Sequence, residues 1–426
     1  MQETRPDTLW TRTAAAPPTS GSALPEKADT VVIGAGFTGL TAARALAKQG
    51  RRVVVLEAGL LGSGASGANA GFLVPNFAKA DPATVYSRLG PQKAEGLLRL
   101  VGGGADTVFD IIREDGISCD ASQNGWLQPA FGEAMAQVLR KRASIWQRLD
   151  RPVRFLEPGE IAHETGMDIY SGGIIDESGG TIHPLDYLYG LARTVLREGG
   201  LIRENAFVQS CRRGPQGWQV EFTDGSIRAD SVVLCTNAFT TGIAGLIGRT
   251  GVPLRVYQVA TGPIDEETVA RISPKRRPVG DTRLNLFTYR LDRDNRLISG
   301  GMAVFPFGAR ERVAKAVVRR LASELKLARH PGIEVAWTGT AIMTPDFLPR
   351  IYDLGEGFFG GIGCNGRGIA MTAQLGGLLA RAAMGEAPQD MPISFLRQKS
   401  LPLHAFAPLV ASAALAHARL KDRLTR

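Results

Sequence analysis

Three glycines in the stretch VVIGAGFTG have the spacing of a phosphate-binding turn. Gly34, Gly36 and Gly39 follow an apolar run, Val31 to Ile33, and precede a helical pattern. At this spacing the first glycine permits a tight turn, the second lets backbone approach a pyrophosphate, and the third lets the helix pack close to the strand. The free N–H groups and the positive end of that helix favour phosphate. The stretch therefore predicts a dinucleotide-binding unit.

An acidic residue completes this motif at the end of the next predicted strand. The run Val53 to Leu56 is followed directly by Glu57, at a position where an acidic side chain accepts the hydroxyls of a ribose. Strand, turn, helix, strand and acid agree, which disfavours a βαβ unit without a nucleotide. The motif leaves NAD and FAD open because it recognises the part that the two molecules share.

A run of small residues after Glu57 favours a flavin. Residues 61–72, LGSGASGANAGF, combine glycine and alanine with hydroxyls and one amide, and we call them the small-residue loop. Such a run lets backbone pass close to a flat ring system while it offers N–H and O–H donors. A flexible linker is the alternative, but a linker is rarely followed so closely by an apolar run such as Phe72 to Val74.

A second glycine turn, GCNGRG at residues 363–368, precedes a helical pattern that ends near Ala383. The start of this helix carries no acidic residue, and Arg367 adds a positive charge to its dipole. Reduced flavin is negative near N1 and the C2 carbonyl, so such a helix start would stabilise that anion and raise the oxidising power of the cofactor. The alternative is a helix cap without a ligand.

Together these motifs resemble the D-amino-acid oxidase superfamily of flavoproteins, and within it the gamma-glutamylputrescine oxidase-like amine oxidases. The resemblance is carried by GAGFTG, VVVLEAG and GSGASGANAGF, by IHPL at 182–185, WTG at 337–339, MTPD at 343–346 and GCNGRG, and it covers roughly residues 28–390. It implies FAD as the cofactor, lying along the small-residue loop.

His183, which precedes a proline at a predicted helix start, is more simply a cap or packing residue than a catalytic base.

The resemblance and the motifs together define a candidate site. The candidate FAD-binding residues are Gly34, Gly36, Phe37, Thr38, Gly39, Glu57, Ala58, Gly64, Ala65, Ser66, Asn69, Ala70, Gly71, Phe72, Val208, Thr236, Asn237, Gly363, Asn365, Gly366, Arg367 and Gly368. The candidate catalytic residues are Tyr257, Tyr289 and Arg290, which lie on strands that the resemblance places in the substrate domain.

The resemblance also implies that FAD is held without a covalent bond. Related enzymes attach flavin through a cysteine where Gly339 stands here, or through a histidine where Ala68 stands. Neither nucleophile is present at these positions, and Cys364 is the thiol that remains near the second glycine turn.

The elements that must position these residues follow from the apolar patterns. Strands are predicted at 125–130, 218–222, 226–234, 254–261, 284–289, 296–299 and 357–362, and helices at 84–150, 311–328 and 366–383. The expected fold class is α/β: a doubly wound, Rossmann-like FAD-binding domain and an interleaved α+β substrate domain built on an antiparallel sheet.

Domain boundaries follow from the same patterns. We expect an extended N-terminal arm at 1–27, the FAD-binding domain at 28–85, 155–250 and 336–395, the substrate domain at 86–154 and 251–335, and a C-terminal helical segment at 396–426. Trp10 and Leu24 are candidates to pin the arm, which otherwise has no core of its own.

Composition excludes several other classes. The net charge of +9 comes from scattered basic residues, without the basic stripe and interleaved aromatics that nucleic acid requires. The four cysteines and five histidines lack metal-ligand spacing, so we expect no metal and a reducing, cytoplasmic location. The first residues do not resemble a secretory signal, and no run approaches the roughly 20 apolar residues of a membrane span.

The expected function is oxidation of a C–N bond in a primary or secondary amine, with hydride transfer to flavin N5, imine hydrolysis and reoxidation by oxygen or another acceptor. Relatives that oxidise amino acids often place an arginine in an L-R-P sequence after this Trp-x-Gly, whereas Ala341 and Ile342 stand here. The alternatives are a D-amino-acid or opine-type dehydrogenase that passes electrons to a quinone, and a nucleotide-binding protein without turnover.

Overall fold

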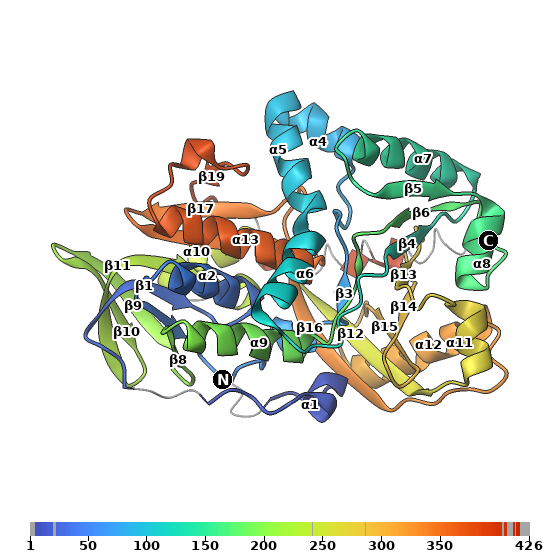
Figure 1. Cartoon of the computed structure of the whole chain (residues 1–426), viewed down its shortest axis with the longest axis horizontal. Helices are drawn as coiled ribbons and strands as arrows, with labels where there is room; N and C mark the ends of the chain where they lie inside the picture. The colour runs from blue at the N-terminus through green and yellow to red at the C-terminus, as the bar shows by residue number, and fades with distance from the viewer. Residues whose placement is uncertain are drawn as a thin grey trace.

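Two large sheets lie next to each other and define the architecture (Figure 1). The structure is a computed structural model that describes residues 5–19, 23–240, 242–285, 287–402, 404–406, 412–413 and 415–417. The α/β fold class expected from the sequence is confirmed, because one sheet is built on parallel strands and the other on antiparallel strands.

The first sheet brings the predicted nucleotide motifs to one edge. Its strand order is β19-β17-β18-β11-β1-β2-β8, and the hairpin β9–β10 pairs with β11. The strands β18, β11, β1, β2 and β8 are parallel neighbours, so their carboxyl ends meet at the edge where such sheets bind ligands. The bounds are β1 Lys27–Ile33, β2 Val53–Leu56, β8 Leu201–Arg203, β9 Val208–Gly214, β10 Gly217–Phe222, β11 Gly225–Leu234, β17 Arg350–Gly355, β18 Phe358–Ile362 and β19 Phe395–Leu396.

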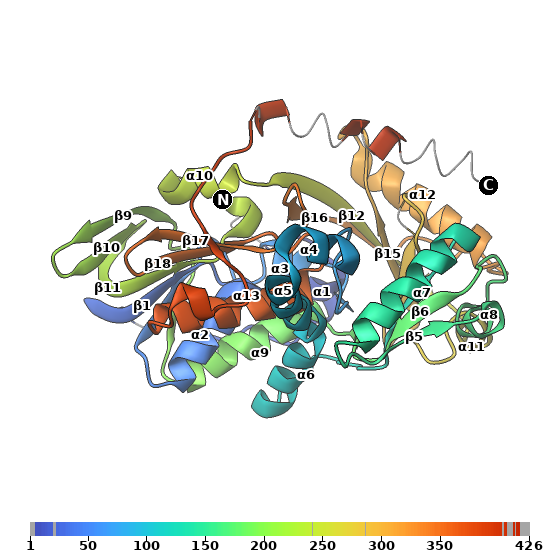
Figure 2. The same ribbon diagram turned by 90° about the horizontal axis from the view of Figure 1, so that it is seen from above.

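The carboxyl-terminal parts of the central strands, Val31–Ile33, Val53–Leu56 and Val232–Leu234, are apolar without a break because both of their faces are buried. Val32 and Val55 pack into a core with the helices α2 (Phe37–Lys48), α9 (Pro184–Arg197) and α13 (Gly368–Ala383), which lie along one face of the sheet (Figures 1 and 2). Val31 and Val54 point the other way, into a second core with the hairpin β9–β10.

The second sheet has the order β16-β12-β15-β14-β13-β4-β6-β5. Its neighbours are antiparallel except β13 and β4. The helix α12 (Ala309–Glu324) covers one face through Val313 and Val318. The bounds are β4 Trp126–Pro129, β5 Val153–Leu156, β6 Gly173–Asp176, β12 Val252–Pro263, β13 Val279–Gly280, β14 Thr288–Leu291, β15 Arg296–Gly301 and β16 Val335–Met343.

Shorter elements connect the two sheets. A two-stranded sheet pairs β3 (Phe72–Leu73) with β7 (Gly180–Thr181), and the region predicted as mainly helical forms α4 to α7. The remaining bounds are α1 Leu9–Thr13, α3 Ala65–Ala68, α4 Pro82–Leu89, α5 Pro91–Gly102, α6 Gly104–Asp115, α7 Glu133–Gln147, α8 Pro158–Thr165, α10 Gly245–Gly248, α11 Glu266–Ile272, η1 Asn237–Phe239, η2 Gly242–Ala244, η3 Pro388–Asp390 and η4 His404–Phe406.

Strand pairing moves three segments relative to the expected domain boundaries. β6 pairs with β4 and with β5, while β16 pairs with β12, so all three segments belong to the second sheet. The sequence ranges placed β6, β16 and part of β5 in the FAD-binding domain, because a strand's apolar pattern does not reveal its partner. We therefore propose that the substrate domain includes β5, β6 and β16.

The N-terminal arm is more ordered than expected. It contains the helix α1, whose Leu9 and Trp10 are buried, whereas the sequence favoured an extended arm. A threonine capping box forms the helix: the side chain of Thr8 accepts the Thr11 N–H, and the side chain of Thr11 accepts the Thr8 N–H. Most of the predicted C-terminal helical segment lies outside the described residues, and its described part includes η4.

Candidate FAD-binding site

The turn between β1 and α2 has the geometry that a close phosphate approach requires. Gly34 has a φ of +100°, which favours glycine, and a Cβ on Gly39 would lie 1.9 Å from the carbonyl oxygen of Gly34. A Cβ on Gly36 would meet one neighbour within 4 Å, the Oγ of Ser66 at 3.1 Å. The first and third glycines therefore shape the turn, and the second leaves space above the backbone.

The start of α2 keeps donors available for an anion. Gly36 is its N-cap, and no side chain among the described residues caps it. The Phe37 N–H donates to Ser66 Oγ at 3.0 Å, while the N–H groups of Thr38 and Gly39 belong to the first turn, which has no partners within the helix. These donors and the helix dipole fit a pyrophosphate.

Glu57 is held at the end of β2 by two backbone donors. Its Oε2 accepts the Ala35 N–H at 2.8 Å and its Oε1 accepts the Gly59 N–H at 3.0 Å. Burial is the largest influence on this carboxyl group and raises its pKa above the ordinary value in spite of these bonds. Each oxygen retains a lone pair, so with Ala58 beside it the carboxylate is able to accept two ribose hydroxyls.

The small-residue loop is folded rather than extended. Residues 65–68 form α3, with Gly64 as its N-cap and Asn69 as its C-cap. The Asn69 Nδ2 donates to Ser66 O at 2.7 Å, and its Oδ1 accepts the Gly71 N–H at 2.9 Å. The loop then enters β3 through Ala70, Gly71 and Phe72. These local bonds argue against the flexible-linker interpretation.

Two asparagines fix the second glycine turn beside the end of β11. The Asn237 Oδ1 accepts the Gly363 N–H at 3.3 Å, so the segment of Thr236 and Asn237 contacts the turn that follows β18. The Asn365 Oδ1 accepts the Thr344 N–H at 2.7 Å, and its Nδ2 donates to Gly363 O at 2.7 Å. The turn therefore reaches α13 along a defined path.

Arg367 leaves part of its guanidinium unpaired at the start of α13. It is the N-cap residue, and its buried Nε has no hydrogen-bond partner among the described residues. Its Cζ lies 5.3 Å from the centre of the Trp126 ring. Burial, together with the nearby charge of Arg142, lowers the pKa of Arg367 to about 10. A half-buried cation with a buried Nε, and with no carboxylate partner among the described residues, fits an anionic or strongly polar ligand group.

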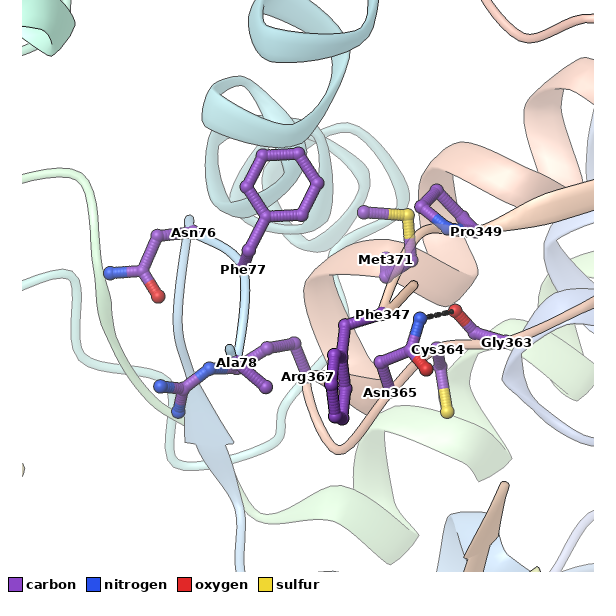
Figure 3. A pocket seen from close by; sticks show the side chains of 10 residues that line it. All are labelled: Asn76, Phe77, Ala78, Phe347, Pro349, Gly363, Cys364, Asn365, Arg367 and Met371. Atoms are coloured by element: carbon purple, nitrogen blue, oxygen red, sulfur yellow. Dashed lines mark hydrogen bonds between the residues drawn. The ribbon is translucent and has the colours of Figure 1, made fainter. Parts of the chain in front are cut away.

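A small pocket adjoins this arginine (Figure 3). Asn76 and Met371 line it together with Arg367 and the turn residues Gly363 to Asn365. In Figure 3 the guanidinium of Arg367 extends away from Cys364 toward the segment that carries Asn76 and Ala78. The Asn76 Oδ1 is buried without a partner among the described residues, so two unpaired polar atoms come from residues that line one pocket. Sequence reasoning missed Asn76 and Trp126, since no motif marks either residue.

Val208 connects to this edge through the backbone. It begins β9, and the nearby Ala206 N–H donates to the carbonyl of Glu57 at 2.8 Å. The side chain of Val208 is buried in the core beneath the hairpin. If Val208 contacts FAD, the contact is therefore made by its backbone and not by its side chain.

The structure does not bring the two candidate catalytic tyrosines to this edge. Tyr289 lies in the core of the second sheet, and its hydroxyl donates to the carbonyls of Ile272 and Thr165 at 3.0 and 3.3 Å. Tyr257 packs on Ala309 and Val313, on the face of the sheet opposite Trp337. We therefore withdraw both tyrosines from the proposed set of catalytic residues.

Arg290 does contact the site, but it does so by binding backbone carbonyls. It is 2% exposed, and its Nη1 donates to the carbonyls of Gly71 and Ile182, each at 2.8 Å. Burial lowers the pKa of Arg290 to about 10. The guanidinium joins the small-residue loop to the residues before α9, so we reassign Arg290 from catalysis to positioning.

His183, the other residue considered for catalysis, is a helix cap. It precedes α9, and its Nδ1 accepts the Asp186 N–H at 3.1 Å. Burial lowers its pKa, which favours the neutral ring that accepts this bond. The capping interpretation is confirmed.

The positions used for covalent flavin attachment elsewhere are adjacent here and carry no nucleophile. A Cβ on Gly339 would lie 3.0 Å from the carbonyl oxygen of Ala68. Cys364 is buried, and burial raises the pKa of its thiol, which disfavours the reactive thiolate.

Within the described part of the chain there is no cluster of metal-binding residues and no helix long and apolar enough to cross a membrane.

Comparisons with known proteins give the geometry a family context. The family profile described as "DAO: FAD dependent oxidoreductase" matches residues 29–382. The chain is 29% identical over 405 residues to a protein named gamma-glutamylputrescine oxidoreductase from Escherichia coli, with 93% of each chain covered. Its structure resembles the glycine oxidase of Geobacillus kaustophilus, with a TM-score of 0.71 and 21% identity over 88% of this chain and 100% of that one. It also resembles the L-proline dehydrogenase of P. horikoshii, with a TM-score of 0.72 and 20% identity over 92% and 99%.

Proposed function

The chain belongs to the DAO family of FAD-dependent oxidoreductases, and on this premise we propose that it oxidises a C–N bond of a primary or secondary amine. The observation that carries the proposal is the match of the family profile over the same segment that forms the nucleotide edge and the second sheet. Bound FAD supplies the two-electron oxidation. The residues of the chain bind and orient it, and hold the reacting carbon away from water.

The protein offers FAD a chemically matched set of residues. The turn at Gly34 to Gly39 fits the pyrophosphate, and Glu57 fits the ribose. The start of α13 carries no acidic residue in its first turn, so together with Arg367 it would stabilise negative charge on a reduced flavin. We include these roles of the candidate FAD-binding residues in the proposal.

The substrate class follows from a missing cation. The positions after Trp337-Thr338-Gly339 where relatives carry the carboxylate-binding arginine and its proline hold Ala341 and Ile342 on β16. Two arginines on neighbouring strands do not replace it, because Arg290 donates to backbone carbonyls and Arg255 is exposed on β12. A buried carboxylate without a partner costs several kcal/mol, and the similarity to gamma-glutamylputrescine oxidoreductase supports an amine.

The test is a panel of amines and of D- and L-amino acids, read by anaerobic bleaching of the flavin absorbance and by steady-state kcat/KM. We expect amines to exceed free α-amino acids by roughly tenfold or more, since one unpaired buried charge is worth more than 1.4 kcal/mol. An α-amino acid that exceeds every amine tenfold would contradict this assignment. In that case, a lower kcat/KM for the α-amino acid in an Arg367→Gln variant would show that Arg367 binds the substrate carboxylate.

The same panel separates the alternative functions. Oxygen consumption with peroxide formation indicates an oxidase, whereas turnover only with a quinone or an artificial acceptor indicates the D-amino-acid or opine-type dehydrogenase. Bleaching by none of the amines or amino acids would favour a nucleotide-binding protein without turnover.

We place the enzyme in the cytoplasm, on the argument that its four cysteines are free thiols.

We predict that the purified protein is yellow and releases intact FAD. Release is expected on heat or acid denaturation, because glycine stands at position 339 and alanine at position 68. The measurement is the flavin absorbance of the supernatant after the polypeptide is precipitated. Flavin that stays with the denatured chain would contradict the prediction, and a Cys364→Ser variant would identify that thiol as the attachment point.

A further inference from the structure

Residues 5–16 of the N-terminal arm lie across the small-residue loop. Its Arg5 Nε donates to the carbonyl of Leu61 at 2.8 Å, at the start of the loop. Its Trp10 Nε1 donates to the carbonyl of Asn69 at 2.6 Å, near the end of the loop. Figure 1 shows α1 at the junction of the two sheets, beside α9 and β16. The arm thus contacts both ends of the loop that the motifs assign to the flavin.

Trp10 is the centre of an aromatic and cationic cluster. Its side chain is 1% exposed. Its ring meets His183 edge-on with centroids 5.0 Å apart, and it meets Trp337 in the same way at 6.1 Å. The Cζ of Arg290 lies 5.7 Å from the Trp10 ring. The arm therefore contacts both the helical layer, through His183, and the second sheet, through Trp337 and Arg290.

Three long side chains bind neighbouring carbonyls of the loop. Trp337 Nε1 donates to Ala68 at 2.9 Å, Trp10 Nε1 donates to Asn69, and Arg290 Nη1 donates to Gly71 at 2.8 Å. The donors come from β16, α1 and β14, which are far apart in the sequence. Because glycine and alanine offer the loop little side-chain packing, its conformation depends on such external donors.

The arm has its own anchors on α9. Thr13 Oγ1 and His183 Nε2 are 3.0 Å apart and share a hydrogen bond, and the Ala15 N–H donates to the Asp186 carboxylate at 2.8 Å. These contacts hold α1 in place independently of the Trp10 bond. The arrangement therefore has a fixed base and an indole that reaches the loop.

We propose that residues 5–16 act as a strap that retains FAD by holding the small-residue loop, with Trp10 as a positioning residue. The strap rests on the proposed FAD site but not on the choice of amine. It restricts the loop at Leu61 and Asn69, so the loop opens for cofactor release only when these two bonds break.

The test compares Trp10→Phe with a matched control, Trp218→Phe. Trp218 is also buried, and its Nε1 donates to the carbonyl of Glu356 at 2.9 Å within the hairpin core. Each variant keeps an aromatic ring and loses one indole-to-carbonyl hydrogen bond. Holoenzyme is diluted, and the release of FAD is followed by its fluorescence. We expect release about tenfold faster for Trp10→Phe, in line with one lost backbone hydrogen bond, and unchanged within about twofold for Trp218→Phe.

A second variant, Arg5→Gln, tests the other end of the strap. Arg5 is partly exposed, so its replacement leaves the core intact, and FAD release is expected to accelerate by a few-fold. The proposal is overturned if Trp10→Phe and Trp218→Phe lower the melting temperature similarly and release FAD at the wild-type rate. The readout needs no substrate, so a holoenzyme that oxidises no amine would refute the proposed function and still decide the strap.

Discussion

Replacing Gly39 by alanine is expected to destabilise the nucleotide-binding half by about 3 kcal/mol or more and to abolish FAD binding. The added Cβ would lie 1.9 Å from the carbonyl oxygen of Gly34 and 3.1 Å from its carbonyl carbon. Both atoms are backbone, so no rotamer change relieves the overlap, and α2 must move away from β1. Chemical denaturation and the FAD content of the purified protein measure the two effects.

Gly36→Ala is the matched control in the same turn. Its backbone φ of −78° suits alanine, and its Cβ would meet only the rotatable hydroxyl of Ser66, at 3.1 Å. We expect the stability of the FAD-free protein to change by less than about 0.5 kcal/mol, while FAD affinity falls on the order of tenfold because the methyl fills the space above the turn. A Gly39→Ala protein with wild-type stability would refute the close packing of α2 on the turn at Gly34. A Gly36→Ala protein with wild-type affinity for FAD would refute the binding of the pyrophosphate above Gly36.

The parts of the site that the sequence predicted are those whose geometry is local. Gly34, Gly39 and Glu57 lie within one βαβ unit, where spacing alone determines which residue makes the turn and which follows the second strand. The turn at Gly363 is similar, since a strand, a glycine turn and a helix are contiguous there. The strands predicted at 254–261, 296–299 and 357–362 were also found, with shifts of at most two residues at their ends, whereas the strand predicted at 284–289 coincides with β14 only at Thr288 and Tyr289.

The parts that the sequence did not predict depend on partners far away in the chain. Tyr289 and Tyr257 have suitable chemistry, but only strand pairing and the position of α12 decide that each faces a core. Arg290 was a candidate catalytic residue because nothing in its local sequence shows that its guanidinium donates to the carbonyls of Gly71 and Ile182. Trp10 was expected to pin the arm, whereas its contact with Asn69 appears only in three dimensions.

Replacing Glu57 by glutamine is expected to weaken FAD binding on the order of 100-fold, which corresponds to about 3 kcal/mol. The carboxylate uses both oxygens as acceptors, one for Ala35 and one for Gly59. Glutamine offers one oxygen and one NH2 group, so in either orientation the NH2 faces a backbone N–H. The variant also loses the charge that strengthens hydrogen bonds from ribose hydroxyls. Titration of apoprotein with FAD, followed by quenching of flavin fluorescence, gives the two dissociation constants.

Asp29→Asn is a suitable control for this carboxylate. Asp29 Oδ2 accepts the Arg52 N–H at 2.9 Å, near the amino end of β1 and away from the nucleotide edge. Its Oδ1 accepts Nε and Nη2 of Arg52 at 3.1 and 2.8 Å, so the NH2 group of asparagine faces a donor in either orientation. Stability is therefore expected to fall, while FAD affinity stays within about twofold. Equal losses of affinity in the two variants would show that Glu57 acts on folding rather than on the ribose.

The pH dependence of FAD binding gives Glu57 a second signature. Burial raises the pKa of the carboxyl group above its ordinary value of 4.5 in the FAD-free protein, and hydroxyl donors bind the ionised form more strongly. FAD affinity is therefore full above this raised pKa and declines as the pH falls through it, a window that opens above 4.5. The Glu57→Gln variant cannot titrate at this position, so its weaker affinity is expected to lack that decline. A wild-type affinity that stays constant across this window would show that no ribose hydroxyl donates to Glu57.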